Sequence, residues 1–234
     1  MKAFLVLTMT ALLAGTGLAL QQTKVKPIEA KAAAGADQAA IAHQLPTYPL
    51  TTCLVSGEPL DAMGGPKDVM HEGRLARLCC KGCIKGFKKD PAKFFAMIDA
   101  AVLKAQKESY PLETCAVSGE PLGSMGDPIE YVHGTRLVRM CCKGCVKGFK
   151  KNPKEHMAKI NAALMAKQRP SYPTEVCLVS GEPLTAMGEP IELLHGTKLV
   201  RLCCKGCIKK FKSDPETFVA KLSGKKKNKQ AKQM

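Results

Sequence analysis

The sequence repeats itself every 62 residues, and this repeat limits what the chain can fold into more than any other feature. Each copy contains C-x-V-S-G-E-P-L, then M-G, a His, and finally R-x-C-C-K-G-C. The interval is the same for Cys53, Cys115 and Cys177 and for Cys79, Cys141 and Cys203, with no residue inserted or lost. Because a fixed internal period indicates repeated structural units, we expect three tandem copies of one small module.

The modules are too small to rely on an apolar core alone. Aromatic residues make up 5% of the chain, and there is no Trp. Units below about 70–80 residues commonly need disulfides or a metal ion to be stable. Structural zinc can supply roughly 10–16 kcal/mol of apparent binding energy to such a unit. The four cysteines of each module are therefore expected to hold it together.

The first copy predicts a short β element followed by helices. Residues 53–57 resemble a short strand entering a tight turn, and residues 74–78 form a second short strand. Residues 80–83 then turn the chain into a helix. Asp90, followed by Pro, is expected to cap a second helix that runs toward Lys107. The predicted class is α+β, with three tandem ββα modules.

The cysteine spacing favours a metal site. Cys79 and Cys83 form a C-x3-C pair, Cys80 and Cys83 form a C-x2-C pair, and Cys53 comes from a separate turn. Small zinc modules combine a turn ligand and a helix-start pair in this way. Thiols at a helix start near lysines are also more acidic.

The motif C-x-V-S-G…C-C-K-G-C-x-K-x-F-K-x-D-P resembles the TRASH/YHS group of heavy-metal-binding domains, over residues 48–98, 110–160 and 172–222. The resemblance implies a treble-clef-like fold, a role in metal trafficking, resistance or sensing, and three ligand cysteines per module. Those ligands are Cys53, Cys79 and Cys83, then Cys115, Cys141 and Cys145, then Cys177, Cys203 and Cys207. Related zinc knuckles have a second Cys where this chain has Ser56, Ser118 and Ser180. The possible fourth ligands are Cys80, Cys142 and Cys204.

Strand alternation gives an expectation for the adjacent cysteines. Ala76, Leu78 and Cys80 fall on one apolar face, so Cys80 is expected to point toward the core. Cys79 falls on the opposite, charged face and is expected to bind metal together with Cys83.

Two other residue types recur in each copy. His71, His133 and His195 are expected to be loop or hydrogen-bonding residues rather than ligands. Met63, Met125 and Met187 are expected to pack in the small core, although a thioether also suits Cu⁺.

Two alternatives use the same cysteines differently. In one, disulfides staple an envelope interaction protein, which is common among exported chains. In the other, Cys80 and Cys83 act in thiol–disulfide exchange as a C-x-x-C pair. Adjacent cysteines such as Cys79 and Cys80 do not easily pair with each other.

The N-terminus is typical of an export signal. Residues 1–19 have a charged start, an apolar run and a small-residue cleavage site, and the run is too short to span a bilayer comfortably. We expect a periplasmic or secreted protein without a transmembrane segment in the mature chain. Residues 20–47 are interpreted as an Ala/Gln/Lys-rich linker that is partly helical.

The formal net charge of +16 suggests acidic partners. Export argues against nucleic acid, which leaves an envelope protein or an anionic surface. The basic segment 223–234 is expected to be a disordered tail that is available for such contact.

The predicted organisation is therefore three metal-binding modules at residues 48–108, 110–169 and 172–222, joined by short helical tethers. The expected function is to bind, buffer or deliver zinc or copper. No paired carboxylates, Ser-His-Asp arrangement or phosphate loop is apparent in the sequence, so an enzyme is not expected.

Overall fold

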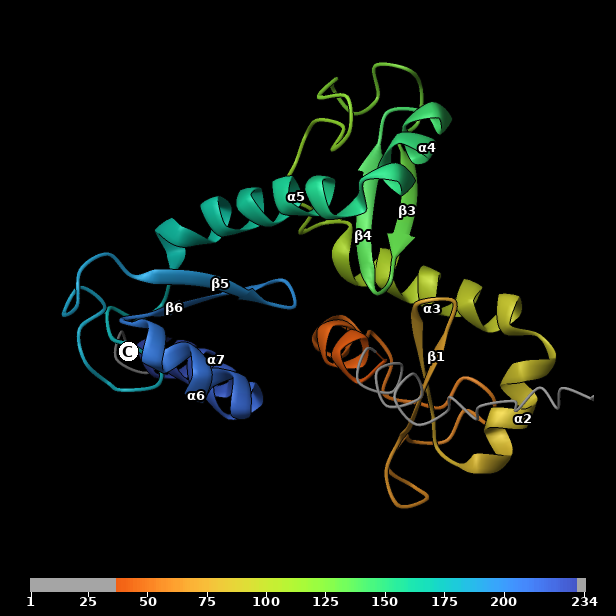
Figure 1. Ribbon diagram of the computed structural model, residues 1–234, viewed down its shortest axis with the longest axis horizontal. Helices are drawn as coiled ribbons and strands as arrows, with labels where there is room; N and C mark the ends of the chain where they lie inside the picture. The colour runs from red at the N-terminus through yellow and green to blue at the C-terminus, as the bar shows by residue number, and fades with distance from the viewer. Residues whose placement is uncertain (1–36, 231–234) are drawn as a thin grey trace, which may run out of the picture.

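Each module consists of a two-stranded antiparallel hairpin, a 9-residue helix and a 16-residue helix (Figure 1). The computed structural model describes residues 37–230, with side chains through residue 222. The first module contains β1 (Lys67–His71), β2 (Arg74–Leu78), α2 (Lys81–Lys89) and α3 (Pro91–Gln106). The second contains β3 (Ile129–His133), β4 (Arg136–Met140), α4 (Lys143–Lys151) and α5 (Pro153–Gln168). The third contains β5 (Ile191–His195), β6 (Lys198–Leu202), α6 (Lys205–Ser213) and α7 (Pro215–Gln230). The α+β class and the three repeated units are confirmed.

The segment that carries the first cysteine is a turn, which corrects the strand expected over residues 53–57. Only an isolated bridge between Thr52 and Pro59 pairs its two sides. The Cys53 N–H donates to the Glu58 carbonyl at 2.7 Å, and the Gly57 N–H donates to the Cys53 carbonyl at 2.9 Å. Gly57 has a φ of 79°, a left-handed conformation that a glycine adopts without strain. Because the turn is this tight, residues 53–57 do not form the continuous backbone hydrogen bonding of a β-strand.

The hairpin has one end at the cysteines and the other end at a turn. In the first module Lys67 lies opposite Leu78, next to the cysteine cluster, and His71 lies opposite Arg74 beside the turn. The hairpin residues Ala76 and Leu78 are fully buried against the two helices. The hairpin therefore fixes the distance between the two ends of the module.

The helix starts agree with the sequence signals. Cys80 is the N-cap residue of α2. Asp90 caps α3, because its carboxylate accepts a hydrogen bond from the Lys93 N–H at 3.1 Å. In the second module Asn152 occupies this position and its side chain forms no cap hydrogen bond.

The 16-residue helices are packed structural elements and not tethers, which corrects the expected organisation. Helix α3 contacts β3 and β4 of the second module, and α5 contacts β5 and β6 of the third. Ile98 and Val102 of α3 are fully buried, in a core cluster that includes Val132 and Leu137 of the next module. Helices α3 and α5 therefore each complete the core of the following hairpin.

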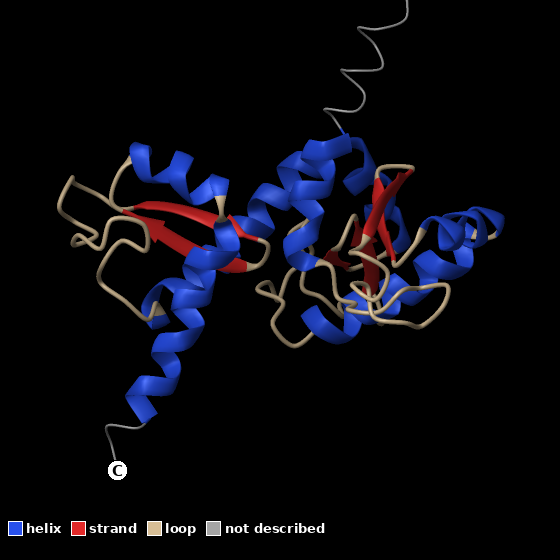
Figure 2. Cartoon of the chain, turned by 90° about the horizontal axis from the view of Figure 1, so that it is seen from below, coloured by secondary structure: helices blue, strands red, loops and turns tan. Residues whose placement is uncertain are grey.

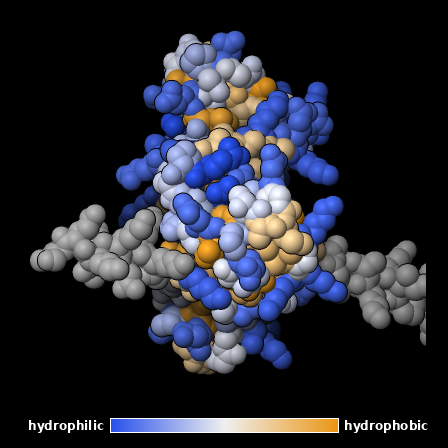
Figure 3. Space-filling view, turned by 90° about the vertical axis from the view of Figure 1, so that its left-hand side faces the viewer, coloured by the Kyte–Doolittle hydropathy of each residue, from blue (hydrophilic) through white to orange (hydrophobic). Residues whose placement is uncertain are grey.

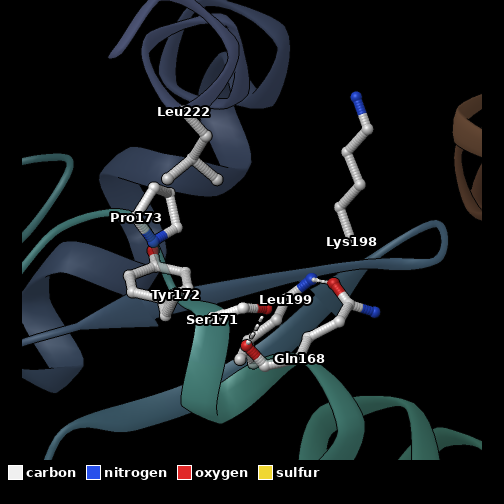
Figure 4. Close-up of a pocket in the computed structure, with 7 residues that line it drawn as sticks. All are labelled: Gln168, Ser171, Tyr172, Pro173, Lys198, Leu199 and Leu222. Atoms are coloured by element: carbon white, nitrogen blue, oxygen red, sulfur yellow. Dashed lines mark hydrogen bonds between the residues drawn. The ribbon is translucent and has the colours of Figure 1, made fainter. Parts of the chain in front are cut away.

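A glutamine at the end of α3 and of α5 fixes this packing. The Gln168 amide donates to the Thr197 carbonyl at 2.8 Å and accepts from the Leu199 N–H at 2.9 Å; Figure 4 shows Gln168 against Leu199. We call this pair of contacts the glutamine bridge. It recurs from Gln106 to Thr135 and Leu137 at 2.8 and 3.0 Å, and from Gln44 to Gly73 and Leu75 at 2.9 and 3.0 Å. The bridge satisfies two backbone groups beside each hairpin turn.

The segment before the first module belongs to the folded structure from residue 37 onward. Residues 37–44 are helical and lead into the 3-10 helix η1 (Leu45–Thr47). Besides the Gln44 bridge, the Thr47 and Thr135 hydroxyls lie 2.6 Å apart. A Cβ added at Gly196 would lie 2.9 Å from the Pro46 carbonyl oxygen, so the third hairpin turn also approaches this segment. The turns of all three hairpins thus meet at residues 44–47, and Figures 1 and 2 show the hairpins around the centre of the molecule.

The face shown in Figure 3 carries many hydrophilic side chains, with smaller hydrophobic patches between them. Within the described part of the chain, no helix is long and apolar enough to cross a membrane. Helix α7 extends to Gln230, into the segment expected to be a disordered tail. The expected signal at residues 1–19 lies outside the described residues.

The glutamine bridge predicts a local effect on stability. Gln106→Ala leaves the buried Leu137 N–H without its acceptor, and we expect the free energy of opening at that amide to fall by about 1–3 kcal/mol. Amide hydrogen exchange of the full chain measures this. Gln168→Ala is the matched control and should affect Leu199 but not Leu137. Equal protection of Leu137 in both variants would show that the bridge does not hold the hairpin.

Candidate metal centre

Three segments bring one thiol each to a common point. Cys53 comes from the turn, Cys79 follows β2, and Cys83 lies in the first turn of α2. Their sulfur atoms all lie within 4.8 Å of one another. The same grouping occurs for Cys115, Cys141 and Cys145 and for Cys177, Cys203 and Cys207. The structure thus brings together the nine cysteines that the sequence singles out.

The spacing of the sulfurs suits a tetrahedral ion. The Sγ atoms of Cys79 and Cys83 are 3.7 Å apart, and the equivalent pairs are 3.7 and 3.8 Å apart. A zinc–sulfur bond of about 2.3 Å places the corners of a tetrahedron about 3.8 Å from one another. The Cys79–Cys83 pair therefore has the spacing that such an ion requires, and the Cys53 sulfur lies within 4.8 Å of both.

The buried member of the adjacent pair is Cys79, which corrects the expectation that Cys80 points into the core. Cys79 is 3% exposed, whereas Cys80 is only partly buried. The alternation stops because β2 ends at Leu78 and Cys80 is already the N-cap of α2. The Cys80 sulfur lies 3.5 Å from that of Cys83 but is not in the group of three. Cys80 is thus positioned beside the site rather than within it.

A serine stands where a zinc knuckle has its second cysteine. The Ser56 hydroxyl lies 3.4 Å from the Cys79 sulfur, and Ser118 and Ser180 make the same contact in the other modules. Burial opposes ionisation of Cys53, but hydrogen bonds from the Ser56 side chain and backbone and from the Cys79 backbone outweigh it and lower the pKa of the thiol to about 6. The turn therefore favours one thiolate per module before any ion binds.

The third thiol of the group is held in its neutral form. Burial, followed by hydrogen bonds to the neighbouring thiols, raises the pKa of Cys83 to about 12. Because the sulfurs are in contact, ionising one disfavours ionising the next. A cation that binds all three must displace the remaining protons.

The backbone of α2 at Gly86 lies close to the Val55 side chain in the turn that carries Cys53. A Cβ added at Gly86 would lie 2.9 Å from the Val55 side chain, and a Cβ added at Gly148 would lie 3.0 Å from the Val117 side chain. The third module has Lys210 at this position. The first two modules thus use a glycine where helix and turn meet.

The three recurring methionines are exposed, which corrects the expectation that they pack in the core. Met63, Met125 and Met187 are 64%, 68% and 72% exposed. Each lies between the cysteine turn and the first strand, in a segment whose neighbouring glycines have positive φ. The chain there loops away from the hairpin, so these side chains have no core to enter.

The recurring histidines lie at the end of the hairpin opposite the thiols. His71 ends β1, about 13 Å along the strand from Lys67. It packs against Phe87 and Phe95, with ring centroids 5.9 and 6.0 Å away. His195 Nε2 lies 2.9 Å from a Glu216 carboxylate oxygen. Packing and hydrogen bonding account for these residues, and no histidine joins a thiol group in the described part of the chain.

All twelve cysteines are free thiols. Their closest contacts, such as 3.5 Å between Cys80 and Cys83, exceed the length of about 2.05 Å of a disulfide bond. The thiols are thus available as metal ligands.

Comparisons with models of protein families, with curated proteins and with solved structures find no match. The resemblance to TRASH/YHS domains rests on the sequence motif alone. The structure itself shows three cysteines within metal-binding distance in each module.

The thiol pKa values predict how the metal-free, reduced chain responds to pH. The Cys53 pKa of about 6 lies below the ordinary value of about 8.5, so its contribution to the free energy of unfolding is complete above about pH 8.5 and is lost as the pH falls through 6. The raised pKa of Cys83, about 12, changes the free energy of unfolding in the opposite direction with pH. The contribution of Cys83 to that free energy is complete below about pH 8.5 and is lost as the pH rises through 12.

Thiolate absorbance near 240 nm follows this ionisation. We expect a step with a midpoint of about 6, and Cys53→Ser should reduce its amplitude by about one third because the other two modules keep theirs. Uniform titration of all thiols near pH 8.5 would contradict the pKa assignment.

Proposed function

We propose that this is an exported metal-binding protein in which each module holds one soft or borderline ion, Zn²⁺ or Cu⁺. The observation that carries the proposal is the group of three thiols in every module, whose sulfur atoms lie within 4.8 Å of one another and include one pair only 3.7–3.8 Å apart. Thiolates are the ligands that both ions prefer. The primary ligands are Cys53, Cys79 and Cys83 and their equivalents.

The fourth position distinguishes storage from a purely structural role. Structural zinc sites are closed by four protein ligands, whereas three ligands leave a position for an exchange partner. The Ser56 hydroxyl and the Cys80 thiol lie at the edge of the group. We infer that this position opens to an incoming thiol, so that the module can accept and release its ion in buffering or delivery.

The charge around the site supports the proposal. Three thiolates around a divalent ion carry a net charge of −1, and around a monovalent ion −2. Lys81, Lys85, Lys88 and Lys89 lie exposed along α2. Their positive charge, together with the N-terminus of α2, offsets the charge of a loaded site.

Location in the periplasm or outside the cell is also a proposal, supported by the signal pattern at residues 1–19. The motif likeness to TRASH/YHS domains fits a role in metal trafficking or resistance. The net charge of +16 favours docking on an anionic envelope surface or an acidic partner over a neutral one.

A second candidate function is thiol–disulfide exchange by Cys80 and Cys83. Hydrogen bonds from the Cys83 backbone and side chain lower the pKa of Cys80, and both thiols are partly exposed. The raised pKa of Cys83 gives the pair one acidic and one neutral thiol. In this case Cys80, not Cys79, would be the essential residue.

Metal content tests the first proposal. Protein purified anaerobically should contain about three ions per chain, one for each group of three thiols, with charge-transfer or edge spectra typical of thiolate ligation. A folded chain without bound metal would contradict it.

Single substitutions separate the two candidate functions. Cys79→Ser removes a member of the group of three and should lower the metal affinity of that module by at least about 100-fold, whereas the neighbouring Cys80→Ser should change it by less than about 10-fold. Competition with a chromophoric chelator measures both. The reverse order, accompanied by loss of disulfide reductase activity in Cys80→Ser, would favour the exchange function.

A further inference from the structure

Arg136 is a buried positive charge in the second module whose counterpart in the first module has a carboxylate partner. Arg74 begins β2 and forms an ion pair with Asp99 of α3. Arg136 begins β4 at the equivalent position, but the residue equivalent to Asp99 is Asn161. The guanidinium of Arg136 therefore occupies the same position as that of Arg74 but has no carboxylate at the position of Asp99.

Among the residues that the structure describes, Arg136 is bound by neutral groups only. Its Nη1 donates to the Gly196 carbonyl at 3.1 Å, and its Nη2 donates to the Asn161 Oδ1 at 3.1 Å. Arg136 is 8% exposed, and within residues 37–222 no carboxylate forms an ion pair with it. Burial lowers the pKa of Arg136, yet a guanidinium stays protonated in proteins. A buried charge without a partner destabilises a fold, so this position favours an external anion.

The surroundings of Arg136 are hollow and carry positive charge. Arg136 and His43 both line two cavities of about 490 and 560 Å³. The first is also lined by His133 and Lys154, and no Asp or Glu among the described residues lines either one. Burial, followed by the positive charges of His43 and Arg74, lowers the pKa of His133.

The start of α5 lies at the same cavity and brings the Lys154 ammonium to it. Pro153 and Lys154, the first residues of this helix, line the first cavity. The side chain of Asn152 does not cap the helix, in contrast to Asp90 in the first module. The N-terminal end of a helix favours negative charge.

We propose that Arg136 binds a small oxyanion of the phosphate class in this cavity. The guanidinium fork matches an oxyanion with two parallel hydrogen bonds, while Lys154 supplies further positive charge and the His43 and His133 rings offer N–H donors. Arg136 contacts the third hairpin turn through Gly196, and the walls include residues of the N-terminal segment. The anion would therefore join three parts of the chain, at a site separate from the thiols.

Inorganic phosphate is the probe, with the full metal-loaded chain in a chloride buffer of matched ionic strength. Calorimetric titration should give about one phosphate per chain, and saturating phosphate should raise the Tm by about 2–4 °C through binding to the folded state. Asn161→Asp restores the carboxylate that Arg74 has, so this variant should bind phosphate at least 10-fold more weakly and show no phosphate-dependent rise in Tm.

The matched control is Lys88→Gln, which changes the net charge by the same amount on the exposed face of α2. It should bind phosphate as the parent chain does. Arg136→Gln should lose binding, and Asn161→Asp keeps the proposal testable if Arg136→Gln fails to fold. The proposal is overturned if several weak phosphates bind equally to all variants. It is also overturned if millimolar phosphate has no effect on the parent chain. The second result is expected where a carboxylate outside the described residues already occupies the cavity.

Discussion

The contact of three thiols from separate segments governs the structure of every module. Cys53, Cys79 and Cys83 can approach within 4.8 Å only if the turn, the end of the hairpin and the start of α2 meet at one point. Thiolates in such contact repel one another, so the metal-free site keeps one thiol acidic and another neutral. A cation removes this repulsion and allows all three sulfurs to ionise. The same atoms therefore determine both the local fold and the proposed chemistry.

Much of the module could be predicted because a comparison of the three copies shows which residues are retained at each position. The strand over residues 74–78, the helix start after Cys80 and the Asp90 cap follow from local sequence signals, and the structure has all three. Choosing Cys79 over Cys80 as a ligand relied on strand alternation, and the structure shows that alternation has already ended there. The grouping of Cys79 with Cys53 and Cys83 thus has a different physical basis, the change from strand to helix at Cys80.

The contacts between modules could not be predicted from a copy considered alone. Gln44, Gln106 and Gln168 recur at the same 62-residue interval, but each belongs to the sequence before the hairpin that it contacts. Taking Tyr48 as the start of the first copy leaves Gln44 in a linker. The prediction that the three recurring methionines are buried was wrong for a related reason. A residue that recurs in every copy is marked as important, but its recurrence does not show whether its side chain faces the core or the solvent. The unpaired Arg136 is visible in the sequence only as Asn161 in place of Asp99.

The glutamine bridge also sets an order of assembly along the chain. Each hairpin is completed by a glutamine 29 to 31 residues before it, so the closing helix has always been synthesised when its hairpin emerges. Residues 37–44 are available before the first hairpin in the same way. Because domains begin to fold during synthesis from the N-terminal side, the glutamine that binds each hairpin turn is already present, and the short helix that follows the hairpin completes its burial. The apolar strand residues are therefore shielded one module at a time as translation proceeds.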